Sequence, residues 1–292
     1  MIKTKKHLGQ HFLTSQKALF DMVTAGDIRS GDLVLEIGPG KGVLTKELLE
    51  KGAQVIAIEK DTDLLPLLKE KFEKELEKGQ LQILPKDILL FDPSILKEYN
   101  KGLNGDYKLI ANIPYYITGA IIEQFLGAKY QPERMVLLIQ KEVADRIIAR
   151  DQKSGNLGGT QSILSIAVAA YGTPKIIAKV PAGAFFPPPK VDSAIISIEG
   201  ISRTFFSDVY PPRVDEPLRV EAGEQRFFEV LKFCFGKKRK QLLGTLTELL
   251  ENRTKALSIL QKADIPEKAR PETLLKEEIG RASCRERVSS PV

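Results

Sequence analysis

Four consecutive residues, Asn112-Ile113-Pro114-Tyr115, combine the groups that can hold the exocyclic amine of a flat base. The carboxamide oxygen of Asn112 and the carbonyl of Ile113, fixed by the rigid Pro114, are acceptors for the two amine hydrogens. Tyr115 offers a ring on which a base can stack. An Asn-x-Pro turn is also a common way to end a strand, so the motif gains meaning only beside a second one.

The second motif is a glycine-rich run, Glu-Ile-Gly-Pro-Gly-Lys-Gly, at residues 36–42. Glycine allows the backbone angles of a tight turn and lets main-chain N–H groups approach a ligand closely. A P-loop needs Ser or Thr after its Gly-Lys pair, and a dinucleotide fingerprint needs a third glycine at Val43. Neither pattern fits. We predict that Gly38 and Gly40 hold a nucleoside-bearing cofactor without a pyrophosphate.

Two carboxylates follow the next predicted strands. Glu59 can accept hydrogen bonds from both ribose hydroxyls of such a cofactor, and Asp87 can accept from its adenine amine. Each can also be an ordinary solvated carboxylate at a strand end. The glycine-rich run, the two carboxylates and the Asn112 motif follow one another along the chain. This order predicts methyl transfer from S-adenosylmethionine to an amino nitrogen. No catalytic base is needed, since the sulfonium makes a good leaving group.

A second wall for the base is predicted at Phe185, which precedes the three prolines at residues 187–189. A base must leave its stack to be modified, and aromatic surfaces offset that cost. Phe185 would clamp the extruded base against Tyr115. The alternative for Phe185, and more so for Phe186, is a core aromatic at a strand end.

Short apolar runs alternate with helical patterns from residue 33 onward. Strands that are apolar on both faces and separated by helices indicate a parallel sheet covered on both sides. We predict a Rossmann-like α/β sheet of the S-adenosylmethionine-dependent methyltransferase class. Its strands are expected at residues 33–37, 55–58, 81–84, 108–111, 135–139, 175–180 and 191–198, the last two at the far edge, with helices near 42–50, 61–78, 118–126 and 141–150.

Three segments are expected along the chain: a catalytic domain at residues 1–202, a linker or insertion at 203–223, and a small all-helical domain at 224–277. The helices of that domain are predicted at 226–235, 241–251 and 254–263. From residue 278 the chain reads Glu-Ile-Gly-Arg-Ala-Ser-Cys-Arg-Glu-Arg-Val, which looks like translated sequencing-library adapter DNA. We therefore treat residues 278–292 as an artefact, which leaves the helical domain truncated.

Composition narrows the class of protein. The two cysteines and two histidines, without a Cys-x-x-Cys pair, argue against a disulfide framework and a zinc site. No apolar run approaches the ~20 residues that span a bilayer, and the basic N-terminus lacks a signal peptide's apolar stretch. These patterns predict a cytoplasmic protein without a metal or a membrane partner. The net charge of +6 is compatible with nucleic-acid binding but more often reflects solubility.

Five motifs are shared with one known family: Gly9-Gln-His-Phe-Leu13, Asn112-Ile-Pro-Tyr-Tyr116, Phe185-Phe-Pro-Pro-Pro-Lys-Val-Asp-Ser193, Arg226-Phe-Phe and Lys237-Lys-Arg-Lys-Gln-Leu242. Through them, and over residues 5–274, the chain resembles the bacterial ribosomal RNA adenine N6-dimethyltransferases of the small subunit, the family named for kasugamycin sensitivity. Tyr116 stands where the family frequently has Asn. The resemblance implies S-adenosylmethionine binding by His11, Leu13, Gly38, Glu59, Asp87 and Asn112.

The resemblance also implies the reaction: N6-dimethylation of two adjacent adenosines near the 3′ end of small-subunit (16S) rRNA, on immature 30S subunits late in assembly. We expect a monomer. The alternatives are a large-subunit (23S) rRNA methyltransferase of the macrolide-resistance type and an assembly factor that acts mainly by binding the immature subunit. DNA methylation lacks support, because no separate base-reading domain is visible.

A basic cluster lies in the expected helical domain, at Lys237, Lys238, Arg239 and Lys240. Such a run is usually a solvated face. In a chain that modifies RNA, we predict that it contacts phosphates, which position the substrate without choosing its sequence.

Overall fold

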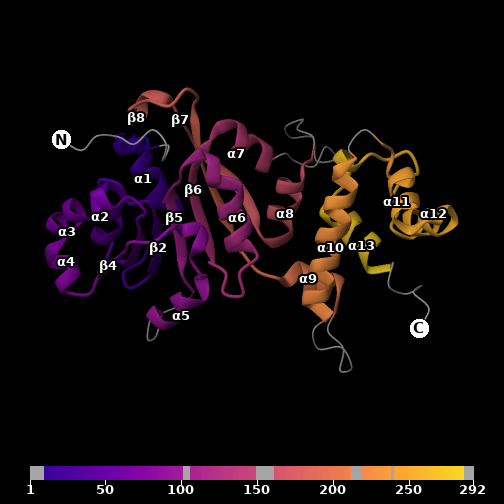
Figure 1. The fold of residues 1–292 in the computed structure, drawn as a ribbon, viewed down its shortest axis with the longest axis horizontal. Coiled ribbons are helices and arrows are strands. Elements are labelled where there is room, and N and C mark those ends of the chain that lie inside the picture. Colours follow the sequence, from indigo (N-terminus) through magenta and orange to yellow (C-terminus); the bar gives the residue numbers. More distant parts are fainter. Residues whose placement is uncertain (1–9, 101–105, 149–160, 212–218, 238–239, 286–292) are drawn as a thin grey trace. The chain divides into compact units, whose positions relative to one another are not determined.

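The computed structural model describes residues 10–100, 106–148, 161–211, 219–237 and 240–285. The chain divides into two compact units, residues 1–144 with 172–201, and residues 145–171 with 202–292. Among the described residues, every strand lies in the first unit, and the second contains helices only (Figure 1). An α/β fold with a helical C-terminal region is thereby confirmed.

A seven-stranded sheet in the order β4-β3-β2-β5-β6-β9-β7 forms the centre of the first unit (Figure 1). The first five strands in this order run parallel, and β9 is antiparallel to both of its neighbours. The two late strands therefore close the far edge, as predicted. The strands are β2 (Leu33–Ile37), β3 (Gln54–Ile58), β4 (Leu81–Leu84), β5 (Lys108–Asn112), β6 (Arg134–Gln140), β7 (Thr173–Val180) and β9 (Ser193–Glu199).

Helices connect these strands, and α1 packs against α2 and against β6, β7 and β9. Strand β2 is buried along its whole length and β6 in all but its two end residues, which explains why they appear in the sequence as mostly apolar runs. The longer connecting helices are α1 (Gln16–Ala25), α2 (Val43–Glu50), α3 (Leu65–Lys71), α4 (Glu73–Glu77), α5 (Leu96–Tyr99), α6 (Thr118–Leu126) and α7 (Lys141–Ile147). The helix predicted at 118–126 is confirmed.

The single helix predicted at 61–78 is wrong, because it is broken at Phe72 into α3 and α4. Phe72 turns into the core, where a Cβ on Gly42 would lie only 2.4 Å from its ring. The adjacent Lys71 donates to the main-chain oxygens of Lys41 and Gly42 at 2.9 and 3.0 Å. The break thus braces the glycine-rich loop from outside the sheet.

Register brings the two sequence motifs together at one edge of the sheet. Ile37, the last residue of β2, pairs with Ala111 of β5, one residue before Asn112. The amide of Gly38 donates to the carbonyl of Ile58 at 2.9 Å. Since parallel strands end at the same edge, the glycine loop and the Asn112 motif both begin there.

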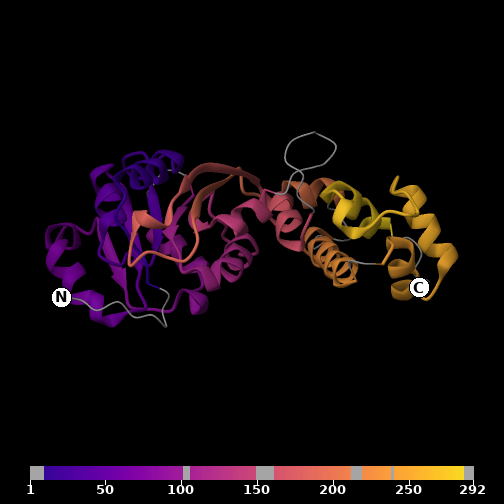
Figure 2. The ribbon, with the colours of Figure 1, turned by 90° about the horizontal axis from the view of Figure 1, so that it is seen from above.

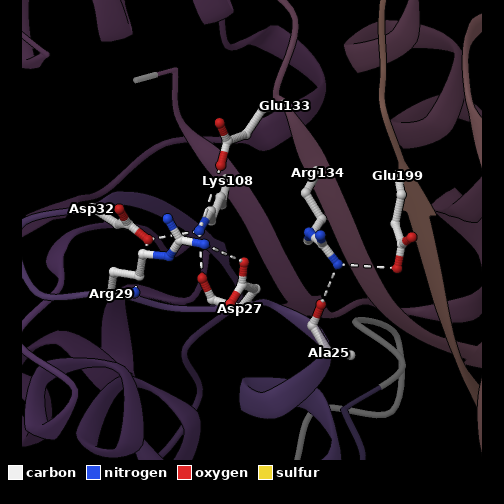
Figure 3. Close-up of polar contacts among 8 residues, drawn as sticks. All are labelled: Ala25, Asp27, Arg29, Asp32, Lys108, Glu133, Arg134 and Glu199. Carbon is white, nitrogen blue, oxygen red and sulfur yellow. Dashed lines mark hydrogen bonds and ion pairs between the residues drawn. The ribbon is translucent and has the colours of Figure 1, made fainter. Parts of the chain in front are cut away.

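The opposite ends of the same strands are held by buried polar contacts (Figure 3). Lys108, the first residue of β5, is 4% exposed and its ammonium donates to the carbonyl of Asp27 and to Asp32, both at 2.6 Å. Arg134 of β6 pairs with Glu199 at 3.0 Å. Because a buried charge is tolerated only with partners, the contacts of Lys108 fix the loop before β2 against β5.

The N-terminal strand β1 (Phe12–Leu13) pairs antiparallel with β8 (Phe185–Phe186) in a separate two-stranded sheet. Thr14 adds main-chain and side-chain hydrogen bonds to the carbonyl of Ala184, at 2.8 and 2.9 Å. This pairing holds the N-terminal residues beside the carboxyl edge of the large sheet.

The helical unit is built around α10, which contacts α8, α9, α11 and α13. Its helices are α8 (Ile163–Tyr171), α9 (Thr204–Val209), α10 (Arg219–Gly236), α11 (Leu242–Leu250), α12 (Arg253–Lys262) and α13 (Lys276–Arg285); in Figure 2 the last of these are orange to yellow. The helices predicted at 226–235, 241–251 and 254–263 correspond to α10, α11 and α12.

The expected domain boundaries need correction. Residues 203–211 are not a linker, because Phe206 of α9 is fully buried and meets Tyr171 and Phe227 edge-on at 5.2 and 5.5 Å. Arg203 pairs with Glu224 at 2.7 Å. The segment 145–171 also groups with the helices and not with the sheet. Residues 212–218 of the expected linker lie outside the described residues.

The C-terminal segment forms α13, in which Ile279 and Ala282 are buried. The adapter origin of residues 278–292 stays a prediction, and residues 286–292 lie outside the described part. None of the described helices is long and apolar enough to cross a membrane. The described residues also contain no group of three or more His, Cys, Asp or Glu that could hold a metal ion.

Candidate cofactor and base site

A cavity of about 420 Å³ opens at the carboxyl edge of the sheet, where β2, β3 and β5 end. Its volume is in the range of small-molecule sites. The lining includes all the residues predicted to hold the cofactor and two further predicted catalytic residues: His11, Leu13, Gly38, Gly40, Glu59, Asp87, Asn112, Pro114 and Tyr115. The structure thus brings these positions together, and their individual roles stay a proposal.

The glycine loop adopts the conformation that its composition predicts. Gly38 and Gly40 have φ angles of +66° and +59°, in the left-handed region that favours glycine. A Cβ on Gly40 would lie 3.1 Å from the ring of Phe12. Larger residues would therefore strain the turn and press on β1, which covers it.

Glu59 lies at the wall of the cavity with only 7% of its surface exposed. Its Oε1 accepts from the amide of Asp61 at 2.7 Å, and its Oε2 accepts from the amide of Gly40 at 3.2 Å. Burial raises the pKa of the Glu59 carboxyl, while these two N–H groups oppose the rise. The carboxylate is thereby held in place with lone pairs left for the hydroxyls of a ribose.

Glu36 is a cavity residue that the sequence prediction missed. It is 1% exposed, and in the described part of the chain its Oε2 has no hydrogen-bond partner. Burial raises the pKa of Glu36 to about 8, with a further contribution from Glu59. The sequence did contain a sign of this residue, because Glu36 is the single carboxylate inside the otherwise apolar run of β2. Glu36 lines the same cavity as Glu59, and a positively charged ligand there would favour the ionised form of its carboxyl, so the residues present fit the sulfonium of S-adenosylmethionine.

The buried acid makes a testable prediction about pH. Between pH 4.5 and about 8 the folded chain keeps the Glu36 proton and the unfolded chain loses it, so the free energy of unfolding falls as pH rises. Glu36→Gln removes this loss, and without cofactor its stability should exceed that of the parent by about 2–4 kcal/mol at pH 8.5. Urea unfolding at pH 6 and 8.5 measures it; a difference independent of pH would contradict the buried, protonated state.

Asn112 ends β5 and points its amide at the N-terminal segment. Its Nδ2 donates to the carbonyl of His11 at 3.2 Å, which leaves Oδ1 as an acceptor. The His11 ring stacks on Tyr115 with centroids 6.1 Å apart, and its Nδ1 lies 2.7 Å from the carbonyl of Pro187. The Tyr115 hydroxyl lies 2.7 Å from Ser193 Oγ. These contacts thus orient both Asn112 and Tyr115, the two side chains predicted to hold the base.

Phe185 does not take the place predicted for it. It is 4% exposed and packs in the hydrophobic core, whereas Phe186 lines the cavity and is 64% exposed. Neighbouring side chains of a strand point to opposite faces, and the register Leu13↔Phe185 turns Phe185 inward. The phenylalanine that shares the cavity lining with Tyr115 is therefore Phe186 and not Phe185.

Asp87 lines the cavity, but both carboxylate oxygens already have partners. Oδ2 pairs with Lys60 at 2.8 Å, and Oδ1 accepts from the amide of Leu89 at 3.1 Å. The hydrogen bond from Lys60 holds the pKa of Asp87 below its usual value. Asp87 is thus an ionised acceptor, and its predicted contact with an adenine amine would use a remaining lone pair.

The basic cluster lies in the helical unit, and only two of its members are described. Lys237 donates to Glu248, Lys240 lies 3.6 Å from the same carboxylate, and Lys237 also stands over the ring of Phe233. Lys238 and Arg239 lie outside the described residues. Since surface pairs of this kind contribute little stability, an incoming phosphate can compete with Glu248 for both lysines.

Comparison with known proteins decides the family. The family model described as ribosomal RNA adenine dimethylase matches residues 1–280. The chain belongs to this family. Members of the ribosomal RNA adenine dimethylase family are methyltransferases that use S-adenosylmethionine, so both the predicted class of enzyme and its cofactor are confirmed.

Three relatives illustrate the likeness. A curated Dehalococcoides mccartyi protein named ribosomal RNA small subunit methyltransferase A is 42% identical over 280 residues, which cover 95% of this chain and 86% of the relative. A solved dimethyladenosine transferase from Plasmodium falciparum is 24% identical with a TM-score of 0.72, covering 93% and 96%. The solved 23S rRNA methyltransferase ErmE is 25% identical with a TM-score of 0.66, covering 96% and 100%.

Proposed function

We propose that this dimethylase acts on small-subunit (16S) rRNA, where it transfers two methyl groups to N6 of each of two adjacent adenosines near the 3′ end, within immature 30S subunits. The observation that carries the proposal is the 42% identity, over 95% of the chain, to a relative named as a small-subunit methyltransferase. The likeness to ErmE is weaker, at 25% identity.

The amine of the target adenine is held by two oxygens. Asn112 Oδ1 accepts one hydrogen and the carbonyl of Ile113 accepts the other, which turns the nitrogen lone pair toward the methyl donor. Pro114, with φ of −57°, fixes the direction of the chain after that carbonyl. S-adenosylmethionine, when bound, supplies a methyl group on a positively charged sulfur. Orientation for in-line transfer is then the main contribution of this motif.

The adenine ring is held by stacking. Tyr115 is kept in place by its contacts to His11 and Ser193, and Phe186 faces the same cavity from β8. Burial raises the pKa of Tyr115, so its phenol stays neutral at physiological pH. On the cofactor side, Glu59 takes the ribose and the glycine loop lies against the methionine portion.

Mapping of the modified nucleotides tests the proposal. The protein is incubated with immature 30S subunits, free 16S rRNA or 23S rRNA together with S-adenosylmethionine, and methylated adenosines are located by mass spectrometry. We expect dimethyladenosine at two adjacent positions near the 3′ end of 16S rRNA. Methylation confined to 23S rRNA would instead support the ErmE-like alternative, since the solved ErmE structure resembles this chain with a TM-score of 0.66.

The helical unit is proposed to contact RNA phosphates through the basic cluster. Replacing Lys237, Lys238, Arg239 and Lys240 by Gln should weaken RNA binding and reduce the slope of log affinity against log salt by about 2–4. Filter binding at several salt concentrations measures this. The control replaces Lys74 and Lys78, in and just after α4, by Gln and should leave the slope unchanged. If the cluster variant kept the parental slope, the cluster would be an ordinary solvated surface and would not bind phosphate.

A role in assembly beyond methylation would appear in cells. A variant that no longer transfers methyl groups but still restores 30S maturation would support the binding-factor alternative. Failure of that variant to restore maturation would tie the effect on assembly to the chemistry.

A further inference from the structure

The rim of the cavity carries apolar side chains that neither the fold nor the chemical step requires. Tyr116 is 65% exposed, and Leu89 and Leu90 are 42% and 87% exposed. Tyr116 and Leu89 belong to the cavity lining, directly beside Tyr115 and Asp87. Exposed apolar groups that adjoin a site mark a surface for binding.

These residues come from two short helices that are held together by α6. The 3₁₀ turns η3 (Ile88–Leu90) and η5 (Tyr115–Ile117) both pack on α6. Gln124 of α6 donates to the carbonyls of Ile88 and Phe91 at 2.9 and 2.7 Å. The rim is therefore a fixed surface and not a pair of independent loops.

Two lysines lie in the cavity lining together with Tyr116 and Leu89, and one of them, Lys60, pairs with Asp87. Lys60 and Lys86 line the same cavity, and Lys60 is 58% exposed in its side chain. Asp87 raises the pKa of Lys60, and Tyr116 adds to the rise. An aromatic ring flanked by exposed cations is the combination that binds unpaired nucleotides, through base stacking and phosphate contacts.

We propose that Tyr116, which shares the cavity lining with the exposed Leu89, is a stacking platform for the nucleotide next to the target adenosine. The inference rests on the proposed function, because an RNA whose target base enters the cavity must leave its neighbour at the mouth. Stacking on the platform positions the strand and holds the target out of its own stack. It is tolerant of base identity, since every base has a flat face.

Steady-state kinetics with 16S rRNA and with immature 30S subunits test the platform. Tyr116→Ala should raise KM for either RNA substrate about 10-fold, with a smaller effect on kcat and none on KM for S-adenosylmethionine. Tyr116→Phe keeps the ring and should behave like the parent. Phe20→Ala removes an aromatic side chain of equal exposure, 65%, outside the cavity lining and should change neither constant.

Three other outcomes would contradict the proposed stacking role of Tyr116 or the function on which it rests. An unchanged KM in Tyr116→Ala, or an equal loss in Tyr116→Phe, would show that the ring does not stack. A loss seen with 30S subunits but not with bare 16S rRNA would place a ribosomal protein on the rim. If the parent protein methylated no small-subunit RNA, the proposed function itself would fail. If the parent and Tyr116→Ala were equally active on that RNA, only the platform would fail.

A modified substrate identifies what lies on the ring. In a synthetic RNA containing the target, an abasic nucleotide next to the target adenosine should weaken binding to the parent protein about 10-fold, measured by fluorescence anisotropy. The same RNA should bind Tyr116→Ala no more weakly than the intact RNA does. Equal losses in parent and variant would show that the neighbouring base lies elsewhere.

Discussion

Replacing Asn112 by Ala is expected to lower the rate of methyl transfer by about 10³-fold, because the amine then loses the acceptor that orients its lone pair. Binding of S-adenosylmethionine should change by less than about 5-fold, since the variant removes a single neutral hydrogen bond, from Nδ2 to the carbonyl of His11. A tritium-transfer assay measures the rate and calorimetry the affinity.

The matched control is Asn100→Ala. Asn100 also donates a side-chain hydrogen bond, to the hydroxyl of Tyr130 at 2.8 Å, but it does not line the cavity. It should transfer methyl groups at the parental rate. Asn112→Asp keeps an oxygen acceptor at the same reach and should retain more activity than Asn112→Ala. Full activity in Asn112→Ala would refute the proposed mechanism.

Replacing Glu59 by Ala is expected to weaken S-adenosylmethionine binding by about 100-fold. Two hydrogen bonds from ribose hydroxyls to a carboxylate contribute a net of about 1.5–3 kcal/mol each, and the lower end of this range corresponds to about 100-fold in affinity. The variant also frees the amides of Gly40 and Asp61, which adds to the loss by loosening the glycine loop. Calorimetry measures the affinity, with the exposed Glu50→Ala as a control of the same chemistry.

A second ligand separates the two causes of that loss. The 2′,3′-dideoxy form of methylthioadenosine should bind the parent protein much more weakly than methylthioadenosine itself. Glu59→Ala should distinguish the two nucleosides poorly. If the variant still discriminated as well as the parent, Glu59 would act only on the loop and its ribose role would be lost.

The central strands β2, β5 and β6 were predictable because nearly all of their residues are buried, which leaves a mostly apolar run. Leu33–Ile37 and Leu81–Leu84 were predicted with the observed ends. Glycines 38 and 40 and Glu59 were also predictable, because turn chemistry and strand ends are local properties. The prediction that these residues meet at one site followed from a single rule, that parallel strands end at a common edge of the sheet.

Errors arose where distant contacts override local pattern. Helix 61–78 breaks because Phe72 packs beneath Gly42, which lies thirty residues earlier. Helix α8 (Ile163–Tyr171) was absent from the sequence prediction, because it is apolar nearly all round and its sequence therefore lacks a helical period. His11 came only from the resemblance, because β1 is two residues long and is ordered by β8. The choice between Phe185 and Phe186 depends on the register of β8 against β1, and two consecutive phenylalanines leave the apolar pattern that would set this register ambiguous.

The most direct test of the mechanism is a crystal structure of the protein with S-adenosylhomocysteine and an RNA containing the target adenosine. The account predicts the exocyclic nitrogen about 3 Å from both Asn112 Oδ1 and the Ile113 carbonyl oxygen, with the base beside Tyr115. A bound adenine whose amine points away from both oxygens would contradict it.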